Sequence, residues 1–254
     1  MNRKKRHDIP GPYIERIRLD RARISNPKHY AYQLPAIRHL DQLKLHPKVT
    51  FFVGENGSGE STLLEALAIA CGLNPEGGSR NMRFRTRESH SNLCEALQVS
   101  KLSAELPDAW FLRAESFFNV ATEIENLDEI ESESLPIIKS YGGISLHEQS
   151  HGESFMSLIE NRFRQGLFLL DEPEAALSPQ RQLQFLILIN ELVQQKSQLI
   201  IATHSPIIMA YPHATIYSFE SDGIAETSYQ ETEHFKTTKL FLDGPERMLS
   251  YLLQ

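Results

Sequence analysis

The sequence has little cysteine and no long apolar run. Its two cysteines, Cys71 and Cys94, do not have the spacing of metal ligands. We expect both thiols to stay reduced in a cytosolic protein and to pack in or near the helix predicted after residue 60. No apolar run approaches the length of a membrane span, and the basic residues 3–6 are not followed by the apolar segment of a signal peptide. These absences predict a cytoplasmic protein without a membrane partner.

An excess of positive charge is also absent. The formal net charge is −7 at pH 7, which disfavours non-specific binding of DNA by the whole surface. Local basic clusters do occur, at residues 3–6 and around Phe84, where they comprise Arg80, Arg83, Arg85 and Arg87. On an extended segment, residues 83, 85 and 87 would share one face. That face suits either a contact with a phosphate backbone or the solubilising edge of an insertion, so DNA stays open as a partner.

The chain has no internal repeat and no coiled-coil heptad run. Its 254 residues, 41% of them hydrophobic, are enough to bury one α/β core, and no shift in composition marks a second domain. We therefore predict a single domain over residues 1–254. Residues 72–108 contain turn residues and little periodicity, which indicates an insertion or cap of loops or short helices within that domain.

Short apolar segments alternate with amphipathic ones along the chain. Strands are predicted near residues 13–19, 49–53, 110–113, 167–170, 198–202 and 214–219. Helices are predicted near residues 61–71, 153–165, 178–196 and 233–241, with a further segment after Pro245. This alternation indicates an α/β fold with a mostly parallel sheet flanked by helices.

A glycine-rich loop between a strand and a helix is the most informative motif. It comprises Gly54, Glu55, Asn56, Gly57, Ser58, Gly59, Glu60, Ser61 and Thr62. The loop matches the phosphate-binding pattern G-x-x-x-x-G-K-[ST], except that glutamate stands in place of lysine. Its backbone N–H groups and the N-terminus of the following helix would attract an anion. We expect the loop to bind the phosphates of ATP and Ser61 to ligate Mg²⁺, although a tight turn that binds nothing would have a similar sequence.

Glu60 is the departure from this pattern. Its carboxylate would stand where the β- and γ-phosphates should lie, which replaces an attraction with a repulsion. We expect weakened nucleotide binding, with the Glu60 side chain in a solvated loop and the fold intact. Glutamate at this position fits a loss-of-function substitution, a decayed site or a native feature of a non-catalytic protein.

Two later apolar strands end in residues that could act on a nucleotide. The run 167–170 is followed by Asp171 and Glu172. Asp171 is expected to hold Mg²⁺ through its water shell, and Glu172 to polarise the water that attacks the γ-phosphate. The second strand is followed by His204, which could hydrogen-bond the γ-phosphate. Each of these residues is common on protein surfaces, but their order after the loop favours the catalytic interpretation.

A fourth motif precedes the Asp-Glu pair by about twenty residues. It contains Ser150, His151, Gly152 and Glu153 and is followed by an amphipathic stretch. A serine and a glycine at a helix N-terminus offer hydroxyl and N–H donors to a phosphate. The same residues also make an ordinary helix cap, so this motif gains weight only beside the other three.

Taken in order, these motifs resemble those of ABC-class ATPases, and among them the small soluble bacterial "AAA family" or RecF/SMC-like ATPases. The resemblance covers about residues 30–220. It is carried by Phe-Val-Gly-Glu-Asn-Gly-Ser-Gly at 52–59, Phe-Leu-Arg-Ala-Glu-Ser-Phe-Phe at 111–118, His-Gly-Glu-Ser at 151–154 and Asp-Glu-Pro-Glu-Ala-Ala-Leu-Ser-Pro at 171–179. The motif at 150–153 is similar to the ABC signature L-S-G-G-Q. The lack of a heptad run separates the chain from SMC proteins with long arms.

The resemblance implies a P-loop NTPase fold with an N-terminal antiparallel β-subdomain, and a head-to-tail homodimer with two ATP molecules at its interface. Residues 150–153 of one subunit would then contact the ATP held by the other, and residues 176–178 would touch the partner subunit. Glu115 stands where the family has its Q-loop glutamine, a metal or water contact. Tyr30 or Tyr32 could stack on adenine, although an aromatic residue there could equally belong to the core.

Two classes of function remain open after these arguments. The first is a Mg²⁺-dependent ATPase that acts as a dimer switch in DNA metabolism, phage defence or the control of a protein effector. The second is a non-catalytic nucleotide-sensing scaffold in which Glu60 is native. The ATPase subunit of a transporter is a weaker third interpretation, because the signature is not standard.

Overall fold

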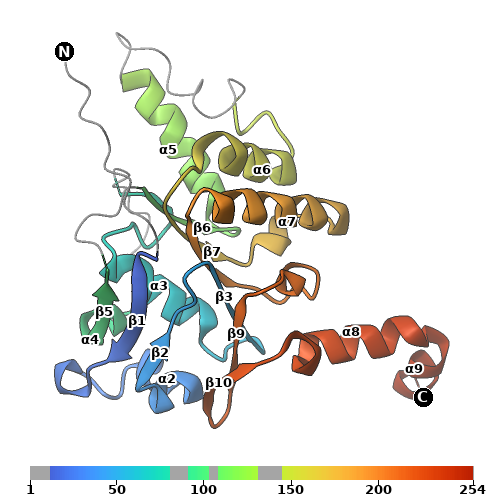
Figure 1. Ribbon diagram of the computed structural model, residues 1–254. Coiled ribbons are helices and arrows are strands. Elements are labelled where there is room, and N and C mark those ends of the chain that lie inside the picture. Colours follow the sequence, from blue (N-terminus) through green and yellow to red (C-terminus); the bar gives the residue numbers. More distant parts are fainter. Residues whose placement is uncertain (1–11, 81–90, 103–107, 131–144, 254) are drawn as a thin grey trace.

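The computed structural model describes residues 12–80, 91–102, 108–130 and 145–253. Within these ranges the strands form a seven-stranded sheet in the order β10-β9-β3-β8-β7-β6-β4 and a three-stranded sheet in the order β2-β1-β5 (Figure 1). The basic cluster at residues 83–87 lies outside the described residues.

The centre of the larger sheet is parallel. Its parallel strands are β6 (Ala109–Arg113), β7 (Leu167–Asp171), β8 (Gln198–Ala202), β3 (Val49–Gly54) and β9 (Thr215–Glu220). Two further strands, β10 (Gly223–Thr227) and β4 (Gly78–Ser79), pair antiparallel at the two edges. Strands β3, β7 and β8 are buried at every residue, which explains their nearly continuous apolar sequence. The predicted α/β class with a mostly parallel sheet is confirmed.

The smaller sheet is the expected antiparallel subdomain. It is formed by β1 (Ile14–Leu19), β2 (Gln42–Lys44) and β5 (Leu97–Lys101). The described part of residues 72–108 thus supplies β4 to the larger sheet and β5 to the smaller one. It also contains a short helix, α4 (Leu93–Ala96). We had expected loops or a short helical cap there. The short strand β5 forms through pairing with β1, far away in sequence, so local periodicity did not reveal it. That residues 72–108 are an insertion in a single domain remains a prediction.

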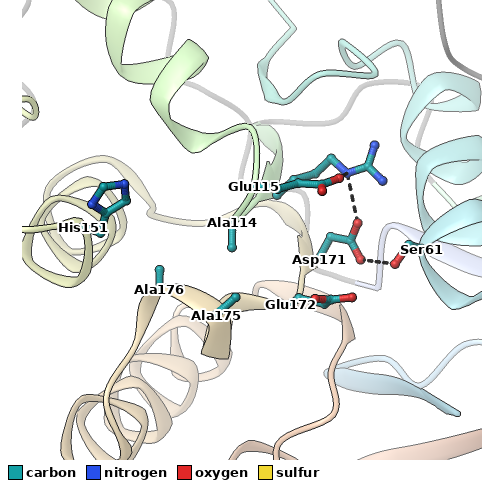
Figure 2. Close-up of a pocket in the computed structure, with 9 residues that line it drawn as sticks. Ser61, Ala114, Glu115, His151, Asp171, Glu172, Ala175 and Ala176 are labelled. Carbon is teal, nitrogen blue, oxygen red and sulfur yellow. Dashed lines mark hydrogen bonds and ion pairs between the residues drawn. The ribbon is translucent and has the colours of Figure 1, made fainter. Parts of the chain in front are cut away.

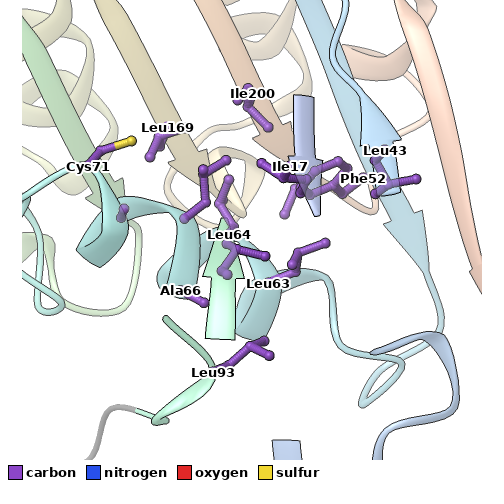
Figure 3. Packing of buried hydrophobic residues seen from close by; sticks show 14 of the residues in the cluster. Ile17, Leu43, Phe52, Leu63, Leu64, Ala66, Cys71, Leu93, Leu169 and Ile200 are labelled. Atoms are coloured by element: carbon purple, nitrogen blue, oxygen red, sulfur yellow. The ribbon is translucent and has the colours of Figure 1, made fainter. Parts of the chain in front are cut away.

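Two hydrophobic clusters lie on opposite faces of the larger sheet. Alternate residues of each strand point to different clusters, so Phe52 belongs to one and Phe51 to the other. Helix α3 (Glu60–Ala70) and the smaller sheet cover the first face, and Figure 3 shows Leu63 and Leu64 packed near Leu169 and Ile200. Helices α5 (Phe117–Ile130), α6 (His151–Arg162) and α7 (Pro179–Gln194) cover the second face.

The remaining helices are α1 (Tyr30–Gln33), α2 (Pro35–His39), α8 (Glu233–Asp243) and α9 (Pro245–Leu252). The predicted helices α3, α6, α7 and α8 are confirmed to within a few residues, whereas α5 was not predicted. Helices α8 and α9 contain no buried residue and extend away from the body of the molecule (Figure 1). None of the helices in the described ranges combines the length and apolar character needed to cross a bilayer.

Both cysteines are free thiols in the structure. Cys71 directly follows α3 and is buried, and Cys94 lies on α4. Burial raises the pKa of the Cys71 thiol to about 11, so this thiol is not a nucleophile at neutral pH.

Candidate nucleotide-binding site

The glycine-rich loop connects β3 to the first residue of α3. Gly57 and Gly59 have φ values of 87° and 113°, in the left-handed region that glycine enters without strain. Gly54 must lack a side chain for another reason, since a Cβ there would lie 2.9 Å from the carbonyl oxygen of Phe219. Leu34 packs against Gly59 from outside the loop. The sequence therefore folds here into the strand-loop-helix unit that the motif predicts.

Glu60 does not lie in a solvated loop, and that expectation was wrong. It is the first residue of α3, and only 6% of its surface is exposed. Its Oε1 atom has no hydrogen-bond partner and lies 2.5 Å from the position that a Cβ on Gly54 would take. The carboxylate is therefore folded back inside the loop. The partial positive charge of the helix N-terminus favours an acidic residue in this first turn.

The hydroxyl of Ser61 meets the carboxylate of Asp171 at the centre of the site. Ser61 Oγ donates a hydrogen bond of 2.8 Å to Asp171 Oδ1 (Figure 2). Helix α3 carries the serine, and the C-terminal end of β7 carries the aspartate. Burial raises the pKa of Asp171 to about 6, although the guanidinium of Arg113 and the Ser61 hydrogen bond oppose this shift. The structure thus brings together two of the three residues that the sequence assigned to a metal, Ser61 and Asp171.

Arg113 joins this pair, and sequence reasoning assigned it no role. Its Nε donates to Asp171 Oδ2 at 3.1 Å, and its Nη1 donates to Glu65 Oε2 at 2.7 Å. Arg113 and Asp171 are direct neighbours in the parallel pairing of β6 with β7. Glu65 follows Ser61 by one helical turn on α3, so both side chains lie on the side of the helix that faces Asp171 and Arg113. The position of Arg113 at a strand end, two residues before Glu115, was the available signal.

Glu115 is placed at the rim of the site. Its side chain is 82% exposed, and its Oε1 lies 3.7 Å from Arg113 Nε. Figure 2 shows Glu115 beside Asp171 at the same opening. Glu115 therefore forms an ion pair with Arg113, and its contact with a metal stays a prediction.

Glu172 and His204 lie side by side at the ends of neighbouring strands. His204 Nε2 is 3.6 Å from Glu172 Oε1. Glu172 has a φ of 48°, an uncommon conformation for a residue other than glycine and one that is often found at functional sites. Its backbone N–H donates to the carbonyl of Ala202 at 2.9 Å, which holds this turn against β8. The structure therefore places both predicted catalytic side chains at the carboxyl edge of the sheet.

Glu174 holds the histidine turn in place, a role that the sequence did not reveal. Its carboxylate accepts hydrogen bonds from Thr203 Oγ1 at 2.8 Å and from the backbone N–H of His204 at 2.5 Å. Burial raises the pKa of Glu174, whereas these hydrogen bonds lower it. The acidic side chain two residues after Glu172 thus ties the ends of β7 and β8 together.

A cleft of about 300 Å³ opens over these residues. Its lining comprises Ser61, Arg113, Ala114, Glu115, His151, Asp171, Glu172, Ala175 and Ala176. Figure 2 shows His151 across the cleft from Ser61. The signature-like motif and the glycine-rich loop therefore border one cavity within a single chain.

The signature-like motif begins α6 with a complete capping box. Ser150 Oγ accepts from the Glu153 N–H at 3.4 Å, and the Glu153 carboxylate accepts from the Ser150 N–H at 3.2 Å. Arg181 of α7 donates to Glu153 at 3.0 Å. Hydrogen bonds from Ser150 and Arg181 lower the pKa of Glu153. Ser150 and Glu153 therefore start the helix, as the simpler interpretation of this motif expects.

Gly152 permits close packing between α6 and the 3₁₀ helix Pro173–Ala176. A Cβ at Gly152 would lie 2.9 Å from the carbonyl oxygen of Ala176 and 3.1 Å from Arg181 Cδ. Overpacking of this kind costs about 1–3 kcal/mol, more than the roughly 0.5–1 kcal/mol that alanine gains over glycine in a helix. We expect Gly152→Ala to lower the melting temperature, measured by thermal denaturation. Gly244→Ala, whose Cβ would meet nothing within 4 Å, is the matched control, and equal melting temperatures for both variants would contradict this prediction.

A second hollow of about 500 Å³ lies on the other side of the loop, between residues 53–58, the end of β9 and the first turn of α8. Tyr32 does not border it and is 6% exposed, with its hydroxyl donating to the carbonyl of Asn92 at 3.1 Å. The expectation that Tyr32 could stack on adenine was therefore wrong, since its ring belongs to the core. Tyr30 is 54% exposed, so its stacking role stays a prediction.

The residues at the cleft fit Mg²⁺ by their chemistry. Ser61 and Asp171 supply hard oxygen donors that already touch each other, and Mg²⁺ typically takes one or two protein oxygens and completes its shell with water and phosphate. Within the described ranges no cluster of three or more His, Cys, Asp or Glu residues forms a metal cage. A metal here would therefore depend on the phosphates for the rest of its ligands.

Two family models match the sequence of the chain. The model described as AAA ATPase domain matches residues 86–209, and the model described as AAA domain matches residues 24–101. Between them they include the glycine-rich loop, the Asp171–Glu172 turn and His204. Over these residues the chain is similar to AAA ATPase domains. No curated protein sequence matches it.

Several solved structures are similar at low identity. The SMC head domain from Thermotoga maritima is 14% identical over 85% of this chain and 98% of that chain, with a TM-score of 0.44. The structure of cbiO1 from Clostridium perfringens, part of an ABC transporter complex, is 16% identical over 85% and 91%, with a TM-score of 0.45. A putative metal-chelate type ABC transporter is 17% identical over 78% and 79%, with a TM-score of 0.47. The class of the fold follows from the sheet order and the strand-loop-helix unit described above, which together define an α/β fold with a mostly parallel sheet flanked by helices.

Proposed function

We propose that this chain is an ATP-binding and ATP-hydrolysing ABC-class ATPase that works as a nucleotide-dependent dimer switch, in DNA metabolism, phage defence or the control of a partner protein. The contact between Ser61 Oγ and Asp171 Oδ1 carries this proposal, because it joins a loop hydroxyl and a strand-end carboxylate in the way that a Mg²⁺-nucleotide site requires. The glycine-rich loop, the Glu172–His204 pair and the AAA-type sequence support it.

The residues divide into three tasks in this proposal. The backbone N–H groups of residues 54–62 bind the phosphates, and Ser61 and Asp171 hold Mg²⁺, which neutralises phosphate charge when it is bound. Glu172, whose carboxylate is exposed beside His204, accepts a proton from the attacking water. His204 donates a hydrogen bond to the oxygen that gains charge.

The position of His151 at the border of the cleft supports the proposed homodimer. In this arrangement residues 150–153 of one subunit close the ATP site of the other, and residues 176–178 lie between them. Residues 150–153 sit next to the Ala175–Ala176 turn, so both proposed partner contacts come from one patch. We also propose that the protein is cytoplasmic.

We expect the Glu60→Lys variant to be monomeric without nucleotide, to dimerise with ATP and Mg²⁺, and to return toward monomer as ATP is hydrolysed. The physical reason is that each ATP would link the loop of one subunit to residues 150–153 of the other. Sedimentation velocity or light scattering with and without ATP measures this change. A molecular mass that does not depend on nucleotide would contradict the dimer switch.

The second candidate function is a non-catalytic nucleotide-sensing scaffold. The buried Glu60 carboxylate favours it, because an acidic group inside the loop opposes phosphate binding in the chain as it stands. Measuring ATP affinity and ATP turnover side by side for this chain and for Glu60→Lys separates the two candidates. Turnover gained with lysine supports the ATPase proposal, and ATP binding without turnover in either protein supports the scaffold.

A further inference from the structure

A second histidine lies directly behind His204. His234 Nε2 is 3.0 Å from His204 Nδ1, and the two ring centroids are 5.2 Å apart. His234 belongs to the first turn of α8 and lies 30 residues after His204 in the sequence. On its other side His204 faces Glu172, with 3.6 Å between Nε2 and Oε1. The three side chains thus form a row from the catalytic carboxylate to the C-terminal helices.

The hydrogen bond between the two rings contains one proton, which can reside on either ring. If His204 Nδ1 were the donor, the bare Nε2 lone pair of a neutral His204 would face the carboxylate of Glu172. If His234 Nε2 is the donor, His204 carries its proton on Nε2 and points an N–H at that carboxylate. The second arrangement replaces a repulsion between a lone pair and an anion with an attraction.

A neutral His234 is consistent with its surroundings. Burial and the neighbouring His204 lower the pKa of His234, although Glu60, Glu233 and Glu55 act in the opposite direction. The net lowering favours the neutral form of His234, in which one ring nitrogen donates and the other accepts.

The base of α8 is fixed to the His204 turn by further contacts. The hydroxyl of Tyr229 donates to the carbonyl of Pro206 at 2.9 Å. Thr232, the N-cap of α8, donates to the carbonyl of Tyr229 at 2.8 Å and accepts from the Phe235 N–H at 3.3 Å. These contacts hold the imidazole of His234 against His204, whereas the rest of α8 and α9 extends outward without a buried residue.

We propose that His234 is a positioning residue, which donates to His204 Nδ1 and thereby keeps the proton of His204 on Nε2, the atom that faces Glu172. This role deepens the proposed ATPase function, because only the Nε2–H form of His204 can donate to a phosphate oxygen or to water at that place. It also makes the C-terminal helical arm, α8 with α9, part of the active site through one side chain.

The first test needs no nucleotide and uses the chain as it is. With ¹⁵N-labelled histidine, NMR correlations between ring nitrogens and ring protons distinguish the two tautomers of His204. We expect mostly the Nε2–H form in the parent chain and a mixture of both forms in His234→Phe, which fills the space but has no donor. His234→Gln, whose amide can donate, should restore the Nε2–H form. His204 signals that are the same in the parent and in His234→Phe would overturn the proposal.

The second test measures turnover in the Glu60→Lys background. We expect His234→Phe to lower kcat by roughly tenfold, the lower end of the effect of a partner that orients a histidine, with little change in KM for ATP. His234→Gln should recover most of the rate, and His39→Gln, which changes an exposed histidine on α2, should leave it unchanged. An unchanged kcat in His234→Phe would overturn the proposal. If Glu60→Lys itself does not hydrolyse ATP, the proposed function fails, and the NMR result alone decides the role of His234.

Discussion

Replacing Glu60 with lysine is expected to raise the affinity for ATP by at least about a hundredfold. A lysine at this position would donate to phosphate oxygens, and hydrogen bonds of that kind contribute roughly 1.5–3 kcal/mol each. The substitution also removes a carboxylate that lies inside the loop, 6% exposed and without a partner for Oε1. Because about 1.4 kcal/mol changes an equilibrium constant tenfold, the two effects together exceed a hundredfold. Isothermal titration with ATP and Mg²⁺ measures this change.

The structure provides a matched control for this experiment. Glu55→Lys makes the same change in charge at an exposed position of the same loop, so it reports the general electrostatic effect alone. We expect it to improve ATP binding far less than Glu60→Lys. Equal affinities in the parent chain and in Glu60→Lys would show that the backbone of the loop and Mg²⁺ are sufficient and that Glu60 is a native adaptation.

We expect the fold to tolerate lysine at position 60. Removing an acidic residue from the first turn of α3 costs about 0.3–1 kcal/mol, and removing a buried carboxylate with an unpartnered oxygen offsets that cost. Without ATP, the melting temperatures of the two proteins should therefore differ by only a few degrees. This comparison ensures that a difference in ATP binding does not come from unfolding.

In the lysine variant, Glu172→Gln is expected to lower ATP turnover at least about a hundredfold, the usual contribution of a general base, while ATP binding is retained. The amide keeps the shape of the side chain but cannot accept the proton of the attacking water. His204→Ala should also reduce turnover, with a smaller effect on binding. Steady-state hydrolysis and equilibrium binding of ATP, measured on the same preparations, separate the two quantities.

Glu191→Gln is the control for Glu172→Gln, because it makes the same substitution at an exposed position of α7 away from the cleft. It should hydrolyse ATP at the rate of Glu60→Lys. If Glu172→Gln and His204→Ala also hydrolyse ATP at that rate, neither residue has the role proposed here, and the water must be activated by another group.

The sequence by itself determined the class of the fold and the edge of the sheet at which the site lies. Strands β3, β7 and β8 are buried on both faces, so their apolar runs are visible without any tertiary information. Residues that directly follow such strands meet at the carboxyl edge of a parallel sheet. It was therefore predictable from the sequence positions of four residues that their side chains lie close together, namely Ser61, Asp171, Glu172 and His204.

Only the tertiary structure decided which side chains surround these residues. Arg113 reaches Asp171 because β6 pairs beside β7, and His234 reaches His204 because α8 packs at its base on the turn after β8. Neither contact joins residues that are close in sequence, so periodicity did not reveal it, and the place of Arg113 at a strand end was the one available signal.

Burial was likewise a property of the folded chain. The sequence placed Glu60 at a loop-to-helix junction, where side chains are commonly solvated, but Leu34 packs on the neighbouring Gly59, and the absence of a side chain at Gly54 leaves space for the Glu60 carboxylate inside the loop. The ring of Tyr32 is likewise buried and belongs to the hydrophobic core. Sequence pattern determines which residues can lie near one another, whereas the packing of whole elements determines which of them lose contact with water, because burial depends on neighbours that are distant in the chain.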